Sequence, residues 1–411
     1  MIPCVTMKKS FLSLFILCLL FMQVGHARYD ETLPKGVRLI AVRQVKTSNI
    51  SDLRNHSGTI ESYGVDYDLD LKSLQSVDGL SEVINYLKDE NPALHDNLHF
   101  GSFNFNVKAS ANVTGFGLGL GLTDKLTIYS IIPYYRASVN VRQTQTRGAN
   151  YQEVNRLQKE QNKDGLQVDL NSLDIEVNDS FIQGAIQNFY GYQPLGHWEA
   201  KGLGDIELGI KYRIKEWNRA GLLVSFGALL PTGREDNPDI IQDFGFGTGH
   251  LGTFLETGVG ASFGYDHELN FWVRGEHHLQ KNRALRPQAS AGDLTDEKNI
   301  YKVSPGTKIQ LAPSYNYFIN DWLDLEAGVL YEKKFKTNYD SDSQENDELL
   351  ESISGYESTM LSGVLNFSTV KLFQKKRFAA PLKLSLRVDD TLKGTNVPDM
   401  TLYSMELRLF F

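Results

Sequence analysis

The sequence predicts an all-β fold, an antiparallel transmembrane β-barrel of about 12 strands, and three observations lead to it. Polar and apolar residues alternate with a period of two over segments of about ten or more residues, longer than most soluble strands. Tight turns and long polar segments alternate between these strands, and the chain ends on a strand. Together these features are typical of barrels whose apolar face contacts lipid and whose polar face lines a lumen.

The composition narrows the functional classes. With 411 residues, 41% of them hydrophobic, the chain is not disordered as a whole. Its formal net charge of -8 argues against a nucleic-acid binder, because phosphate contacts need a basic surface. A large soluble enzyme and a membrane barrel remain as alternatives.

Residues 1–27 have the pattern of a signal peptide. Lys8 and Lys9 precede an apolar run over 11–24 that is too short to cross a bilayer, and small residues then suit cleavage near Ala27. Residues 28–411 are expected to form a single barrel domain in the bacterial outer membrane.

Two further features of the leader matter. Met7 is an alternative start to Met1, since it is followed directly by the two lysines. Cys4 and Cys18 both lie in the leader, so the exported chain is expected to have no disulfide, no cysteine-ligated zinc and no cysteine nucleophile.

The alternation places strands along the whole exported chain. They are expected at 37–47, 101–122, 125–145, 201–214, 220–233, 250–264, 267–280, 303–318, 322–336, 356–373, 379–391 and 400–411. An even number puts both ends of the chain on the periplasmic side. The first strand and 356–373 alternate weakly, so ten or fourteen strands stay open as alternatives.

The connections fall into two classes. Tight turns are expected at 123–124, 216–219, 266–267, 320–321 and 374–377. Long polar segments are expected on the extracellular side at 48–100, 146–200, 234–249, 281–302 and 337–355. Helix-like patches at 80–89 and 151–162 are interpreted as caps on that side.

One strand changes phase. Between 101 and 122 the apolar residues sit at odd positions up to Val113 and at even positions from Phe116. The sequence therefore predicts a β-bulge near Gly115, where a glycine permits the bend.

The polar face of the strands predicts the lumen wall. Its charges have both signs, so they are expected to pair across strands and to give no strong ion selectivity. The predicted lumen-lining residues are Asp205, Glu207, Lys211, Arg213, Arg274, Glu276, His278, Asp324, Glu326, Lys383, Arg387, Glu406 and Arg408.

The last strand carries apolar residues from Tyr403 to Phe411 on one face. A terminal Phe after such a row resembles the signal that the barrel-assembly machinery recognises, so Tyr403 and Phe411 are predicted assembly residues.

Several motifs are similar to one family. The segment 202–212, followed by 230–233 (Leu-Pro-Thr-Gly) and 246–249 (Phe-Gly-Thr-Gly), resembles the meta-pathway phenol-degradation family of outer-membrane proteins. The residues 121–125 and 33–36 are also similar to that family. The resemblance implies a porin-like channel that admits aromatic or other hydrophobic small molecules.

An aromatic stretch lies in a long loop that is otherwise polar. It needs something to bury it: it plugs the mouth, extends the flanking strand or binds an apolar solute. Its candidate vestibule or ligand residues are Phe181, Ile186, Phe189, Tyr190, Tyr192 and Trp198.

Three other motifs are weaker. Residues 247–252 spell G-x-G-x-x-G, but a strand rather than a helix follows, so a loop corner is the better interpretation. His277 and His278 point to opposite strand faces, and only His278 is expected in the lumen. A lipid hydrolase would need a Ser or Asp beside a histidine in the fold, and Ser262, on a neighbouring strand, is the nearest candidate.

The acidic stretch 340–348 lacks the glycine and spacing of a calcium loop. We therefore expect no metal and no cofactor, and no enzyme.

The sequence thus favours an outer-membrane channel for small hydrophobic solutes. A plugged scaffold or adhesion barrel and a lipid hydrolase are the alternatives. Expected partners are outer-membrane lipids and lipopolysaccharide, the barrel-assembly machinery and a small hydrophobic solute, with no nucleic acid.

Overall fold

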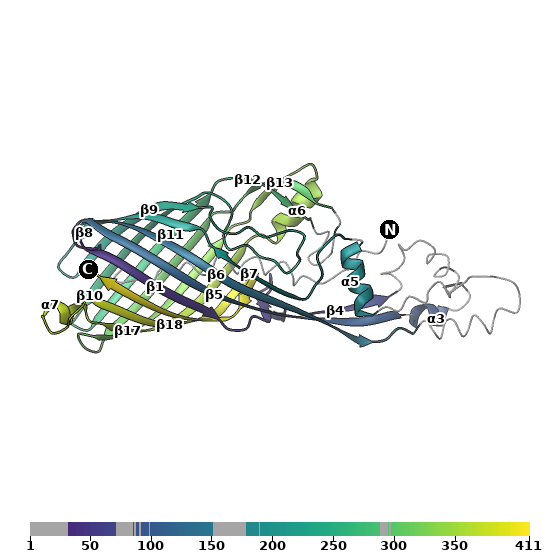
Figure 1. Cartoon of the computed structure of the whole chain (residues 1–411), viewed down its shortest axis with the longest axis horizontal. Helices are drawn as coiled ribbons and strands as arrows, with labels where there is room; N and C mark the ends of the chain where they lie inside the picture. Colours follow the sequence, from purple (N-terminus) through teal and green to yellow (C-terminus); the bar gives the residue numbers. More distant parts are fainter. Residues whose placement is uncertain are drawn as a thin grey trace, which may run out of the picture.

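Twelve strands close into one antiparallel barrel, as the sequence predicts (Figure 1). The computed structural model describes residues 32–70, 85, 88–89, 92–97, 99–150, 178–188, 190–287, 295 and 297–411. The barrel strands are β1 (Arg38–Thr47), β5 (His99–Thr123), β6 (Leu126–Arg147), β8 (Ile206–Glu216), β9 (Ala220–Leu230), β10 (Gly252–Phe263), β11 (His267–His278), β14 (Lys308–Phe318), β15 (Leu323–Lys334), β17 (Tyr356–Ser368), β18 (Leu382–Thr395) and β20 (Thr401–Phe410).

Each barrel strand pairs with the next one along the chain, and β1 closes the ring by pairing with β20. The closure runs to the last residue: the Arg38 amide donates to the Phe411 carbonyl at 2.7 Å, and the Phe411 amide donates back at 3.0 Å. The terminal strand therefore has a partner on both sides in the folded barrel.

The two ends of the barrel differ in their connections. At the end that we call the turn end, β5–β6, β8–β9, β10–β11 and β14–β15 are joined by short turns, and both the residues that precede β1 and the C-terminus lie there (Figure 1). The opposite end carries the long connections, and we call it the loop end.

The connection between β17 and β18 differs from the prediction. The strand expected to reach residue 373 ends at Ser368, and helix α7 (Val370–Gln374) follows in place of a tight turn at 374–377. The apolar residues of α7 do not alternate, and Lys376 adopts a left-handed φ of 56° that ends the helix.

The loop end has its own secondary structure. One small sheet contains β2 (Asp52–Arg54), β3 (Ile60–Ser62) and β19 (Val397–Asp399), and a second contains β12 (Lys281–Leu285), β13 (Asn299–Ser304) and β16 (Asn338–Asp340). The predicted strand 303–318 is therefore two strands, β13 and β14. The remaining elements are β4 (Val65–Asp70), β7 (His197–Leu203), α3 (Pro92–Asn97), α5 (Asp179–Asn188) and α6 (Gln344–Ser352).

The structure describes only part of the two helix-like patches that were expected to cap the barrel. Of the patch at 80–89 the structure describes residues 85, 88 and 89, all helical, and the patch at 151–162 lies outside the described residues. No helix in the described part of the chain is long and apolar enough to cross a membrane.

A belt of exposed apolar side chains surrounds the barrel. These residues alternate with inward-facing ones, as a period of two requires. The inward residues are polar on most barrel strands and include buried apolar residues or glycines on others, such as β5 and β9. The belt includes Ile40, Val42, Phe116, Leu118, Ile128, Leu208, Phe226, Leu255, Val259, Leu269, Phe271, Leu325, Leu361, Leu386, Val388, Tyr403, Met405, Leu407 and Leu409.

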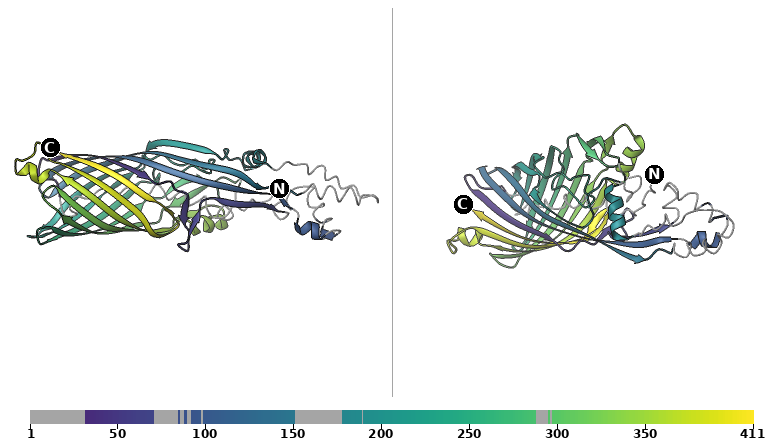
Figure 2. Two further views of the ribbon diagram at one scale, coloured as in Figure 1. Left: turned by 90° about the horizontal axis from the view of Figure 1, so that it is seen from below. Right: turned by 45° about the vertical axis from the view of Figure 1, so that its right-hand side comes forward.

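The β5–β6 hairpin is much longer than the others and extends beyond the barrel rim at the loop end (Figures 1 and 2). The predicted bulge near Gly115 is wrong: the pairing of β5 with both neighbours runs through Gly115 without a shift, and the register shifts lie at 102–103 and 121–123. The odd-numbered residues of β5 face inward along the whole strand. The backbone therefore keeps its orientation, and the apolar residues shift from the inner face to the outer face along the strand.

The predicted strand 201–214 is broken into β7 and β8 at Gly204–Asp205. The break lies opposite Pro133, which has no amide hydrogen to offer a neighbouring strand, and the Gly204 amide donates to the Pro133 carbonyl at 2.8 Å. The wall thus bends at this point, and both flanking strands continue on β6.

Candidate functional site

The interior of the barrel is the candidate functional site. Ion pairs connect inward side chains of different strands along its wall. Arg274 is 3% exposed and donates to Glu207 and to Glu276, each at 2.7 Å. Its guanidinium also lies 4.0 Å from the ring centroid of Phe254. Lys308 contacts the other oxygen of Glu276 at 2.7 Å. These contacts join β8, β10, β11 and β14 into one network.

A second network lies across β15, β17 and β18. Arg387 donates to Asp389 at 2.7 Å and to the Ser362 hydroxyl at 2.7 Å. Asn366 donates to Asp324 at 2.7 Å. Buried charges of this kind need such partners, since an unpaired one is costly away from water.

All thirteen predicted lumen residues are buried or half-buried, and none is exposed. Asp205 and Arg213 depart from the simple lumen role. Asp205 accepts hydrogen bonds from loop residues at the β7–β8 break, and Arg213 donates to the Asp124 carbonyl at 2.6 Å at the turn end. The lumen role of this set stays a proposal.

Four further polar residues of the interior were not predicted from the sequence. Tyr129, Glu256, Lys308 and Glu332 all contribute polar contacts to the networks. Glu332 continues the inward row of Asp324 and Glu326, but an inward Leu330 interrupts the polar pattern. Continuing the alternation of β15 past its inward apolar residue would have placed Glu332 on the inner face.

The aromatic loop stretch is held by an apolar surface. Helix α5 places Ile186 in a buried cluster with the inward residues of β5 and β6, and Phe181 and Tyr190 pack against the same cluster. Trp198 lies in β7 and extends the sheet beside β6. For Trp198, the alternative that the stretch extends a strand is therefore right. Residues 179–188 instead form a helix that covers the wall. Phe189 lies outside the described residues.

A cavity of about 220 Å³ lies at the loop end, and we call it the mouth cavity. Its apolar lining includes Tyr192, Ile240, Ile241, Leu285, Val303 and Leu350. Its basic lining consists of His250, His278, Arg283, Arg286, Lys308 and Lys334, and its acidic lining of Asp236 and Asp243. The cavity therefore combines an apolar wall with more basic than acidic side chains.

Ion pairs fix the loops around this cavity. Asp239 contacts Arg286 and Lys298, each at 2.8 Å, and the hydrogen bond from Lys298 lowers the pKa of Asp239. Arg286 also lies 4.4 Å from the ring centroid of Tyr192. Burial lowers the pKa of His250, whose Nδ1 lies 2.8 Å from the Leu279 carbonyl.

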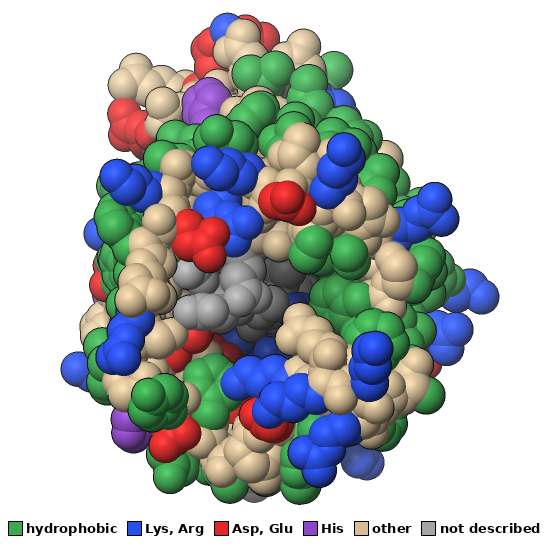
Figure 3. Space-filling model, turned by 90° about the vertical axis from the view of Figure 1, so that its left-hand side faces the viewer, with side chains coloured by type: hydrophobic (Ala, Val, Ile, Leu, Met, Phe, Trp, Pro, Cys, Tyr) green, Lys and Arg blue, Asp and Glu red, His purple; other side chains and the backbone are tan. Residues whose placement is uncertain are grey.

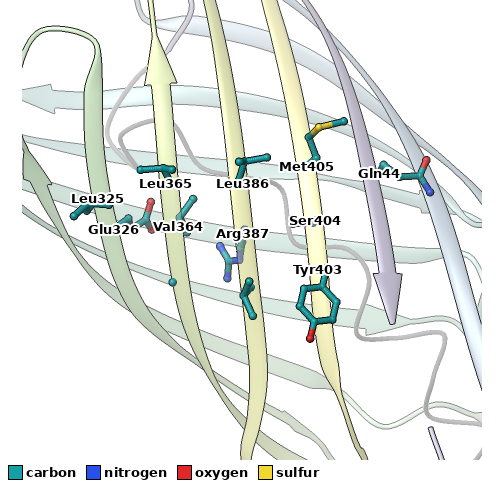
Figure 4. A pocket seen from close by; sticks show the side chains of 12 residues that line it. Gln44, Leu325, Glu326, Val364, Leu365, Leu386, Arg387, Tyr403, Ser404 and Met405 are labelled. Carbon is teal, nitrogen blue, oxygen red and sulfur yellow. The ribbon is translucent and has the colours of Figure 1, made fainter. Parts of the chain in front are cut away.

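A broad groove of about 760 Å³ lies in the barrel wall across β15, β17, β18, β20 and β1 (Figure 4). Leu325, Leu386, Tyr403 and Met405 contribute exposed side chains to it. Gly363 leaves open space where a side chain would otherwise stand. The groove therefore interrupts the apolar belt with a shallow hollow.

The turn end is narrowed by the segment that precedes β1. The Leu33 amide donates to the Thr127 hydroxyl at 2.8 Å, and the Gly36 amide donates to the Gly121 carbonyl at 2.8 Å. A Cβ on Gly121 would lie 2.1 Å from the Pro34 carbonyl oxygen. Glycine is thus required at 121 for this close approach.

Basic side chains, with acidic ones among them, are spread over the rim of the turn end (Figure 3). Helix α7 is tied to the neighbouring turn by an ion pair between Lys375 and Asp321 and by Lys371, which lies 4.8 Å from the Phe318 ring centroid. The turns at this end carry Lys35, Arg38, Lys125, Lys215, Arg219, Lys371, Lys375, Lys376 and Arg377.

The proposed hydrolase pair does not form. Ser262 lies at the turn end of β10, opposite Glu268, whereas His278 lies at the loop end of β11, opposite Gly252. The two side chains are at opposite ends of one hairpin. His277 points outward, as expected.

The two remaining motifs have structural roles. Residues 247–251 form a loop corner before β10. In the acidic stretch, Asp347 accepts from the Ser341 amide at 3.0 Å and Ser343 caps α6, and no group of three or more potential metal ligands occurs in the described part of the chain.

The predicted assembly residues Tyr403 and Phe411 point outward, with 52% and 59% of their surface exposed. They belong to the apolar outer face at the end of the chain, whereas Glu406 and Arg408 of the same strand face inward.

Comparison with known proteins supports the fold. No protein-family description matches this chain, and no curated protein is similar enough to count as a relative. A solved outer membrane channel from Pseudomonas putida F1 is 14% identical, with a TM-score of 0.53, and the match covers 95% of this chain and 100% of that chain.

Two other solved structures are more distant. The Ralstonia pickettii toluene transporter TbuX is 9% identical over 92% of this chain and 90% of its own, with a TM-score of 0.35. The P. putida toluene transporter TodX is 11% identical over 92% and 91%, with a TM-score of 0.34.

Proposed function

We propose that this protein is an outer-membrane channel for the passive uptake of small hydrophobic or aromatic molecules. The mouth cavity carries the proposal: a hollow with an apolar wall opens at the loop end of a closed barrel whose outer belt is apolar. Barrel interiors are usually polar, so an apolar wall at the entrance favours solutes with an apolar part over sugars and inorganic ions.

The fold and the motifs support the same function. The channel from P. putida F1 has this fold, and the motifs at 202–212, 230–233 and 246–249 resemble the meta-pathway phenol-degradation family. The apolar belt then contacts outer-membrane lipid, the loop end faces lipopolysaccharide and the turn end faces the periplasm. Lipid chains fill the groove over Gly363.

Uptake by cells tests the proposal. A Gram-negative host without its own channels for such solutes would express the protein, and uptake of radiolabelled toluene would be compared with uptake of arabinose. We expect faster uptake of toluene and little change for arabinose. Val303→Trp fills the mouth cavity and should abolish the gain.

A matched control uses the same strand. Ile300 is 70% exposed on the outer side of β13, so Ile300→Trp adds the same ring without filling the cavity. Both variants need the heat-modifiable mobility of a folded barrel. Equal uptake of toluene by both variants would overturn the role of the cavity.

A sealed scaffold barrel is the second candidate, because Glu207 has no exposed surface and Arg274 almost none. The same experiment decides between them, since a sealed barrel would give no gain for either solute.

A further inference from the structure

One cation of the mouth cavity, Lys334, has no hydrogen-bond or ion-pair partner among the described residues. Arg283 contacts Asp236, Arg286 contacts Asp239 and Lys308 contacts Glu276. Lys334, the last residue of β15, lines the same cavity and makes no hydrogen bond or ion pair with any residue that the structure describes. The cavity therefore presents one ammonium group that is free to meet a solute.

The position of Lys334 makes this free charge unusual. Lys334 pairs directly with Lys308 across β14 and β15, and like charges in opposed positions destabilise a sheet. Glu276 is already engaged by Lys308 and Arg274. Glu332 lies on the same face of β15 and interacts electrostatically with Lys334, but its oxygens accept from Gln310 and Tyr356. A bound anion would supply a countercharge in direct contact with Lys334, which gives the arrangement a reason in binding rather than in folding.

His278 provides a second unpaired polar group. Its side chain is 6% exposed, lines the mouth cavity and has an Nε2 atom without a hydrogen-bond partner in the described part of the chain. The ring lies against Gly252, where a Cβ would approach it to 2.7 Å. The Nε2 atom itself is buried against Gly252, so the ring must turn to reach a solute. A neutral imidazole donates from one ring nitrogen, so the turned His278 donates a hydrogen bond without becoming charged.

The rest of the cavity suits an aromatic ring. Ile240, Ile241, Leu285, Val303 and Leu350 form its apolar wall. An apolar cavity of about 150 Å³ in another protein holds benzene. A cavity of about 220 Å³ therefore has room for one such ring and one small polar substituent.

We propose that the mouth cavity binds a monoaromatic carboxylate, with its carboxylate on Lys334 and His278 and its ring against the apolar wall. This inference rests on the proposed function and narrows its solute class from hydrophobic molecules to aromatic acids. A charge-assisted hydrogen bond is stronger than one between neutral groups, so the acid is selected over neutral analogues of the same shape.

Binding to the purified full-length protein in detergent micelles tests the inference without transport. Benzoate and its neutral isostere benzamide would be titrated by calorimetry. We expect benzoate to bind at least tenfold more tightly than benzamide, and Lys334→Met to remove that preference. Since Lys334 faces Lys308, its replacement should not weaken the barrel, which heat-modifiable mobility would verify.

Lys333→Met is the matched control. Lys333 is the preceding residue of the same strand, points to the opposite face and pairs with Glu357 at 3.2 Å. This variant should keep full preference for benzoate. His278→Leu should weaken benzoate several-fold, while His278→Gln, which retains a donor, should recover part of the loss.

The outcomes separate this inference from the proposed function. Equal affinity for benzoate and benzamide, or equal loss in the Lys333 and Lys334 variants, would overturn the acid site, even where toluene uptake still shows a channel. The opposite result is also informative. If purified protein binds benzoate through Lys334 but cells that express it gain no uptake of toluene or benzoate, the acid site is supported and the channel is overturned.

Discussion

The β10–β11 hairpin keeps one apolar face along its whole length, whereas the β5–β6 hairpin exchanges its apolar face half-way. On β10 and β11 the outer face is mostly apolar from end to end, with polar exceptions such as Thr257 and His277. The inner residues are buried: most are polar on β11, and most are glycine on β10. On β5 the outer residues are apolar only from Phe116 onward, and the inner residues are apolar only up to Val113.

Strand length explains the difference. The 12 residues of β10 span roughly 40 Å, which at a tilt of about 40° matches the height of a membrane barrel. The 25 residues of β5 span roughly 85 Å, twice what the bilayer needs. The excess projects into water, so its outer face becomes polar and its inner face is buried by α5 and the loop ends.

The largest expected effect tests this boundary with two arginines on one face of one strand. Leu118→Arg puts a charge on the belt, where Leu118 is 49% exposed, and we expect a loss of about 2–4 kcal/mol in the free energy of unfolding. Asn106→Arg places the same group on the outer face of the projecting half and should cost almost nothing, since Lys108 already points outward there. Urea unfolding in lipid vesicles, followed by mobility on gels, measures both. Equal losses would show that the belt does not end near Phe116.

The periodicity predicted all twelve barrel strands, because alternation survives wherever one face meets lipid. The failures have specific causes. The phase change in β5 looked like a bulge because the sequence shows which residues are apolar, not what surrounds them. Helix α7 is too short for its pattern to stand out from a turn.

The candidate site was harder to predict, since it depends on contacts between distant segments. Lys334 and Lys308 become neighbours only through the register of β14 with β15, and an inward Leu330 hid the polar row that leads to Lys334. His278 was predicted on the inner face, but its partnerless Nε2 is visible only in the structure.

A second, smaller effect concerns the bend that distinguishes the β7–β8 wall from the straight β10–β11 wall. The Asp205 carboxylate accepts from the Gly233 amide at 3.0 Å and from the Thr248 amide at 2.7 Å and hydroxyl at 3.1 Å. A Cβ on Gly247 would lie 2.2 Å from Asp205, so the glycine motif makes room for this acid.

Asp205→Ala leaves these donors without their acceptor and should cost about 1–3 kcal/mol, since water at the loop end replaces part of the loss. We expect the loop over 231–251 to become several-fold more sensitive to protease, with the barrel still intact on gels. Glu235→Ala, in the same loop but half-exposed and paired with Lys281, is the control and should change little. An unchanged cleavage rate for Asp205→Ala would mean that other contacts hold the loop.

The smallest effect tests the inner face of the turn-end half of β5, where glycines stand in place of the polar and charged residues found inside β11. Gly121→Ala would bring a methyl group to 2.1 Å from the Pro34 carbonyl oxygen, whereas the same change at Gly115 meets its nearest atoms at 3.9 Å. We expect Gly121→Ala to displace residues 32–36 at a cost of about 1 kcal/mol, because this segment lies near the end of the chain and can move aside.

A single cysteine at Thr32, in a chain whose Cys4 and Cys18 are changed to serine, reports the displacement through its rate of maleimide labelling. Labelling should be several-fold faster with Gly121→Ala and unchanged with Gly115→Ala. Equal rates in both would place the segment before β1 outside the barrel wall and leave the glycine row without its proposed reason.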